Sequence, residues 1–183
     1  MTFAQYVQQR AEDAVRMFPP ERGIYAVTFR IDSVDQDPRC PYVAVGYTTE
    51  TDAAEAAGQT PDAWEARWSY AYFPATGLEG VRVVGLDPDG ARAFRHEALA
   101  QGLWYDDGDE PGDRDEQLTE WFYEVCVGTA RHLHDSGRIV EALGRPVPVL
   151  LYDMFDPDAM FELTSAANPV DLVGEFMAEA DRE

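Results

Sequence analysis

Two apolar runs near the N-terminus constrain the fold of this chain more than any other feature. The runs "GIYAVTFRID" and "YVAVGYTT" are rich in β-branched and aromatic residues, which are typical of strands. Between them, "SVDQDPRCP" is too long for a tight hairpin and too short for a crossover helix. The pattern therefore predicts two paired strands that run antiparallel to each other.

Two segments outside this pair of strands have apolar residues at helical spacing. Residues 2–18 predict an amphipathic helix that begins at a capping box between Thr2 and Gln5. A second, longer helix is expected over residues 115–135, where one apolar stripe repeats at helical spacing. The stripe comprises Leu118, Trp121, Phe122, Val125, Thr129 and Leu133.

Capping residues followed by proline predict further helix starts. These starts are Thr60-Pro61, Asp87-Pro88, Asp156-Pro157 and Asn168-Pro169, and a short helix is also expected over "ETDAAEAAG". "RPVPVLLYD" predicts a strand from Val149 onward, and "GVRVVGLDP" is a strand or a buried connector. We therefore expect one α+β domain over residues 1–183, with a small, mainly antiparallel sheet covered by several helices.

Charge restricts the partners of this protein. The 14 basic residues, all arginine, against 35 acidic residues give a net charge of −21. Such a field repels nucleic acid and anionic membrane surfaces, so neither is expected as a partner, whereas a basic protein is attracted. The alternative is that the acidity only keeps the protein soluble.

The compartment is predicted from cysteine usage and the N-terminus. Cys40 and Cys126 show no metal or redox spacing, and a domain of this size needs no disulfide, so both are expected as reduced packing thiols. The N-terminal segment lacks a basic start followed by an apolar run. We expect a cytoplasmic protein.

The acidic loop "DDGDEPGDRDE" invites comparison with calcium-binding loops. With Gly112 at the sixth position, Asp107, Asp109, Asp113 and Asp115 fit the pattern. Leu118, however, stands where the bidentate carboxylate belongs, so a solvated loop that charges the next helix is the better interpretation.

Other catalytic or metal chemistry has weak support. Asp153, Asp156 and Asp158 follow a predicted strand and are weak metal-ligand candidates, but Asp156 is expected to cap a helix. His132 and His134 point apart on a helix, and no serine or cysteine has a nucleophile context. No cofactor and no catalytic residue are expected.

The stretch "AWEARWSYAYFP" has two competing periods, one of a strand and one of a helix. Together with "IYAVTF", "TTETDAAEAA" and the closing "LYDMFDPDAMFELTSAANPVDLVGEFM", it resembles the bacterial domain-of-unknown-function family 4303 over nearly the whole chain. In that family the Arg-Trp-Ser starts a short helix through a serine capping box, which this chain retains only in part. The resemblance implies a break at Ser69 with helical turns on either side.

The resemblance implies no established activity, and it suggests by analogy an immunity-like inhibitor of a basic toxin. Core packing is the main expectation for the aromatic stretch, with a partner surface as the alternative. Three function classes stay open: an acidic protein-binding module, a metal-assisted hydrolase centred on Asp153, and a homodimeric structural protein, so the protein is expected as a monomer or homodimer. The candidate partner-binding residues are Trp64, Arg67, Trp68, Tyr70, Tyr72, Asp107, Asp109 and Asp113.

Overall fold

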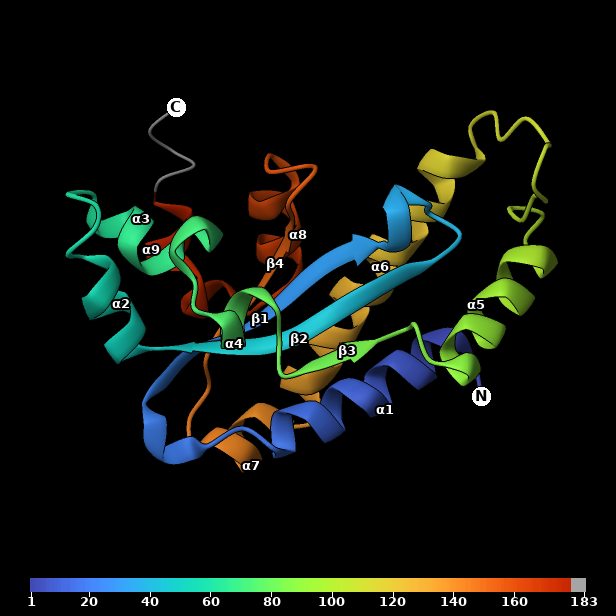
Figure 1. The fold of residues 1–183 in the computed structure, drawn as a ribbon. Coiled ribbons are helices and arrows are strands. Elements are labelled where there is room, and N and C mark those ends of the chain that lie inside the picture. The colour runs from blue at the N-terminus through green and yellow to red at the C-terminus, as the bar shows by residue number, and fades with distance from the viewer. Residues whose placement is uncertain (179–183) are drawn as a thin grey trace.

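A mixed four-stranded sheet lies at the centre of the protein, with the strand order β3-β2-β1-β4 (Figure 1). The structure is a computed structural model that describes residues 1–178. Its strands are β1 (Ile24–Ser33), β2 (Pro41–Thr49), β3 (Arg82–Val84) and β4 (Val149–Asp153). The α+β fold class is confirmed.

Strand pairing combines an expected and an unexpected relationship. β1 and β2 are antiparallel, as predicted, and β3 adds antiparallel to β2, so "GVRVVGLDP" does contain a strand. β4 lies parallel to β1, with Val27 beside Val149. Two pairings are antiparallel and one is parallel, which makes the sheet mixed rather than wholly antiparallel.

The larger hydrophobic core covers one face of the sheet. α1 (Phe3–Arg16), α5 (Pro88–Ala100), α6 (Arg114–Asp135) and α7 (Arg138–Leu143) supply its helical side. The Thr2–Gln5 capping box of α1 and the buried stripe of α6 are present as predicted, although Trp121 is only partly buried. On α5, Phe94 and Ala98 face the core, whereas Leu99 is 55% exposed.

A smaller core covers the opposite face, under α2 (Glu50–Ala56), α3 (Ala63–Trp68), α4 (Ala75–Leu78) and α9 (Gly174–Met177). α4 rests directly on Gly46, where an added Cβ would lie 2.0 Å from the carbonyl oxygen of Thr76. The carbonyl of Gly77 accepts hydrogen bonds from Thr28 Oγ1 and Tyr152 Oη, each at 2.9 Å. The main chain of α4 is therefore bonded to the sheet itself.

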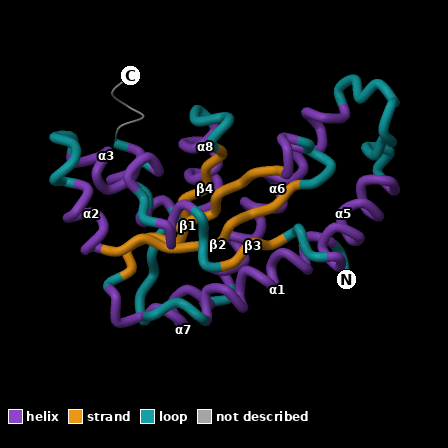
Figure 2. The backbone as a smooth tube through the Cα atoms, in the orientation of Figure 1, coloured by secondary structure: helices purple, strands orange, loops and turns teal. Residues whose placement is uncertain are grey.

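α8 (Ala159–Ala167) lies beside β4 (Figure 2), and its side chains contribute to both cores. Asn168 was expected to begin another helix, but it ends α8, and only a single 3₁₀ turn, Val170–Leu172, follows Pro169 without a side-chain cap. Its Oδ1 accepts from the Val149 amide and its Nδ2 donates to the Val149 carbonyl, each at 2.7 Å. This bidentate contact to an edge strand explains why Asn168 does not cap a helix start.

Two other predicted helix starts are displaced along the chain. α3 begins after Asp62, whose carboxylate accepts from the Trp64 and Glu65 amides, while Thr60 binds the Glu65 carboxylate. The expected cap at Asp156 is also wrong, because the Asp156 amide donates to the Asp153 carbonyl in a turn and α8 begins later. Asp87 caps α5 as predicted.

The remaining expectations concern membranes and thiols. Within residues 1–178, no helix combines the length and the apolarity needed to cross a bilayer. Both cysteines are unpaired, but only Cys126 is a packing residue, because Cys40 is exposed in the loop between β1 and β2.

Candidate binding surface

The aromatic stretch breaks at Ser69, as predicted. α3 ends at Trp68, and Ser69 has an extended backbone (φ −80°, ψ 125°). A single 3₁₀ turn, Tyr70–Tyr72, follows, and Ser69 Oγ accepts from the Ala71 amide at 3.4 Å. The segment is therefore two short helical turns at an angle rather than a strand.

Most of the large side chains of this stretch point into the smaller core. Trp68 is 6% exposed and packs edge-on against Tyr25 and Phe176. The ring of Trp64 stacks on Phe161, and its Nε1 donates to the Phe176 carbonyl at 2.9 Å. Trp64 and Trp68 thus anchor α3 to the C-terminal helices.

The two tyrosines of the stretch lie in the 3₁₀ turn and are half-buried. Tyr70 stacks on Tyr152 with the ring centroids 5.0 Å apart, which ties the turn to β4. Tyr72 is likewise only partly exposed. Neither ring is presented as an open platform for a partner.

Arg67 is engaged within the protein. Its guanidinium makes a bidentate pair with Glu50 at 2.7 and 3.0 Å and lies 4.1 Å from the centroid of the Tyr25 ring. The hydrogen bonds from Arg67 lower the pKa of the Glu50 carboxyl, whereas burial acts in the opposite direction. Arg67 therefore links α3 to the start of α2.

The acidic loop contains exposed carboxylates with local contacts. Arg39 binds Asp107 at 2.8 Å and Asp37 at 2.7 Å while it lies over the Tyr105 ring. Asp109 accepts from the Asp106 amide at 3.1 Å, and Asp113 precedes α6 without a side-chain cap bond. Arg39 therefore links the acidic loop to the connection between β1 and β2. The run of acidic residues continues into the first turn of α6.

Asp153 is held by two donors at the carboxyl end of β4. Tyr123 of α6 donates to Oδ2 at 2.9 Å, and the Phe155 amide donates to Oδ1 at 2.8 Å. Burial, with Asp153 nearby, raises the pKa of the Tyr123 hydroxyl well above its usual range. Asp156 and Asp158 are exposed, and the Asp153, Asp156 and Asp158 carboxylates form no metal-binding group. The Asp153–Tyr123 pair fixes the end of β4 against α6.

A groove of about 680 Å³ runs between α6 and α8. Val127 and Leu163 supply apolar surface to it, and Arg131 crosses one part of it, where Nε donates to the Ala166 carbonyl at 2.6 Å. Exposed carboxylates line both sides of the groove. They belong to Glu116, Glu120 and Glu124 on α6 and to Asp156 and Glu162 beside them.

None of these five carboxylates forms an ion pair within residues 1–178, whereas Arg131 is the one arginine among the described lining residues. Of the five, only Asp156 was a candidate from the sequence, as a weak metal ligand, and the four glutamates were not predicted. The four-residue spacing of Glu116, Glu120 and Glu124 was a visible signal of one acidic helix face. Their position opposite Glu162 depends on how α8 docks, which the sequence does not specify.

A second hollow, of about 420 Å³, lies at the end of the sheet where Asp153 is found. Arg30 pairs there with Asp32 and lies 5.6 Å from the centroid of the Tyr42 ring, and Phe155 beside it is 65% exposed. Phe155 directly precedes Asp156 of the acidic groove. An exposed aromatic side chain such as Phe155 next to a charged groove is typical of protein-binding surfaces.

Comparison of this chain with protein-family models, with curated proteins and with solved structures finds no match.

Proposed function

We propose that the protein is a non-catalytic, acidic protein-binding module that takes a basic segment of a partner into the α6/α8 groove. The observation that carries this proposal is the set of five carboxylates around that groove without ion pairs in the described chain. The resemblance to the family described above gives the proposal its more specific form, an immunity-like inhibitor that occludes a basic toxin. Because occlusion needs only binding, it requires no catalytic residue.

The chemistry of the groove fits a lysine- or arginine-rich segment that also carries an apolar side chain. The five carboxylates attract the cationic groups, while Val127 and Leu163 provide contact area for an apolar side chain. The net charge of −21 extends this attraction to long range and speeds association with a basic partner. Such binding weakens as salt screens the charges.

The geometry gives less support to the two alternatives. A metal-assisted hydrolase needs several free ligands, but Asp153 is already bonded to Tyr123 and the Phe155 amide, and within residues 1–178 no three acidic, histidine or cysteine side chains form a metal-binding group. A homodimer through the aromatic stretch needs exposed rings, whereas Trp68 is buried and Trp64 is packed on Phe161.

The proposal is tested by direct binding with a charge-matched pair of variants. A labelled arginine-rich peptide is titrated with the protein and the fluorescence anisotropy is followed at low and high salt. The groove variant is Glu120→Gln/Glu124→Gln. The control is Glu55→Gln/Glu79→Gln, which removes the same charge from two exposed positions away from the groove.

We expect salt-sensitive binding that weakens about tenfold in the groove variant, because two carboxylate contacts are lost, and much less in the control. An equal loss in both variants would show that overall charge, not the groove, attracts the peptide. Partners captured from a cell lysate are then measured against the same two variants. A partner that binds the groove variant as tightly as the original protein would overturn the assignment.

A further inference from the structure

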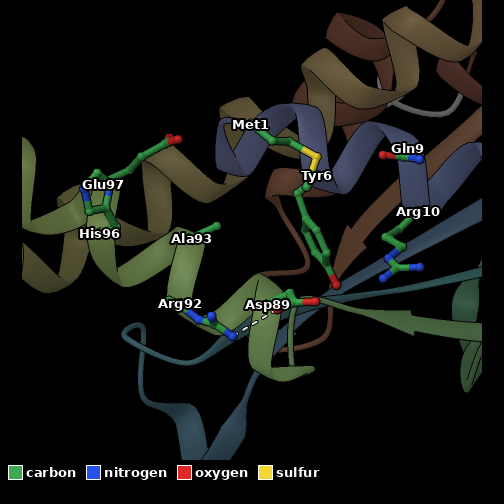
Figure 3. Close-up of a pocket in the computed structure, with 9 residues that line it drawn as sticks. All are labelled: Met1, Tyr6, Gln9, Arg10, Asp89, Arg92, Ala93, His96 and Glu97. Atoms are coloured by element: carbon green, nitrogen blue, oxygen red, sulfur yellow. Dashed lines mark hydrogen bonds and ion pairs between the residues drawn. The ribbon is translucent and has the colours of Figure 1, made fainter.

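We infer that the pocket between α1 and α5 binds a small molecule through a carboxylate or phosphate group. This pocket lies outside the α6/α8 groove and has a volume of about 470 Å³ (Figure 3). It is lined by Tyr6, Gln9 and Arg10 of α1 and by Asp89, Arg92 and His96 of α5. The first observation that points to a ligand is the hydroxyl of Tyr6.

Tyr6 is 2% exposed, and its buried hydroxyl has no hydrogen-bond partner. Figure 3 shows the ring directed from α1 toward the first turn of α5. The ring packs closely against Gly90, since an added Cβ at this position would lie 2.7 Å from Tyr6 Cε1. A buried hydroxyl without a partner costs about 1–3 kcal/mol, so its presence at a pocket calls for an acceptor from outside the chain.

The charges of the pocket indicate what kind of acceptor this is. Each carboxylate that lines it is already used: Asp89 pairs with Arg92 at 2.9 Å, and Glu97 accepts from the Phe3 amide at 2.6 Å. Arg10 lies 5.5 Å from the centroid of the Tyr6 ring and has no ion pair within residues 1–178. A cation left without an anion, beside a hydroxyl left without an acceptor, fits an oxyanion.

The neighbouring side chains are consistent with a small organic anion. Arg92 is exposed and can turn from Asp89 toward a ligand, and the Gln9 amide offers a further donor. The methyl group of Ala93 provides apolar surface for the remainder of the molecule. This site would give an otherwise strongly acidic protein one place that accepts an anion.

The test is a titration of the ¹⁵N-labelled protein, followed by amide chemical shifts, with inorganic phosphate, with acetate, and with chloride at matched ionic strength. Three variants are compared with the original chain. Arg10→Gln removes the free cation, Tyr6→Phe removes only the hydroxyl oxygen, and Arg82→Gln removes an arginine outside the pocket.

We expect saturable shifts at Tyr6, Arg10 and Ala93 with phosphate or acetate and none with chloride. The dissociation constant should rise about tenfold in Arg10→Gln and about three- to tenfold in Tyr6→Phe, the loss of one charge-assisted hydrogen bond in each case, and stay unchanged in Arg82→Gln. Saturation by phosphate alone or by acetate alone would identify the ligand group. Absence of saturable shifts with both probes, or an unchanged dissociation constant in Arg10→Gln, would overturn the inference.

Discussion

The side chain of Thr164 makes the two backbone hydrogen bonds to Leu151 that a neighbouring strand would otherwise make. Thr164 Oγ1 accepts from the Leu151 amide at 3.0 Å and donates to the Leu151 carbonyl at 3.2 Å, and Thr164 is fully buried. Together with Asn168 at Val149, it satisfies backbone groups that the outer edge of β4 would otherwise leave open.

Removing that hydroxyl should destabilise the protein. Thr164→Val keeps the shape of the side chain but leaves the buried Leu151 groups without partners, so we expect the free energy of unfolding in urea to fall by about 2 kcal/mol. Thr129→Val is the matched control, because Thr129 is also buried but donates only to the Val125 carbonyl of its own helix. Similar losses in the two variants would contradict this role of Thr164.

Gly46 should tolerate no larger residue. Gly46→Ala places a methyl group against the backbone carbonyl of Thr76, so α4 must shift, and we expect a loss of at least about 3 kcal/mol. Gly128→Ala in α6 meets nothing within 4 Å and should instead stabilise the protein by about 0.5–1 kcal/mol. Thermal and urea unfolding measure both changes, and a neutral Gly46→Ala would show that α4 is not seated on the sheet.

The stability should fall as the pH drops below about 6.5 because of His134. Burial lowers the pKa of this imidazole, although the contact of its Nε2 with Asn168 Oδ1 at 2.9 Å acts in the opposite direction. The unfolded chain therefore takes up a proton first as the pH falls below about 6.5, and the folded state loses stability. His134→Gln should flatten this part of the pH profile in urea unfolding, and an unchanged slope would exclude His134 as the cause.

The two thiols should react in separate steps. Cys126 is fully buried, and burial raises the pKa of its thiol far above the usual range, whereas Cys40 is exposed. A thiol reagent should label Cys40 alone in the folded protein and Cys126 only after unfolding in urea, as mass spectrometry of the labelled chain would show. Labelling of both thiols at equal rates in the folded state would contradict the burial of Cys126.

Local sequence patterns predicted much of the fold. The Thr2–Gln5 capping box, the Asp87-Pro88 helix start and the antiparallel pair of β1 and β2 are determined by neighbouring residues, and each is present. The break at Ser69 follows from the same kind of local chemistry.

Where the predicted helix caps were wrong, hydrogen bonds that the sequence pattern does not reveal prevail over the local preference for a helix start. Asn168 resembles a helix cap in the sequence, but its amide binds Val149 across the β4 edge. Asp156 resembles one too, but it takes part in a turn with Asp153. The acidic groove could not be predicted for the same reason, because it arises only when α8 docks beside α6.

The hydrogen bonds between α4 and the sheet constrain the sequence of the sheet more than the sequence of α4. The acceptor of both hydrogen bonds is the main-chain carbonyl of Gly77, which is present whatever side chains α4 carries. The donors are the side chains of Thr28 and Tyr152 on the sheet, and α4 lies against Gly46 on the same sheet. Much of α4 can therefore diverge between relatives, whereas the three sheet positions cannot change independently of one another. Distant relatives should be recognisable by a threonine, a glycine and a tyrosine on three adjacent strands, even where little else in their sequences aligns.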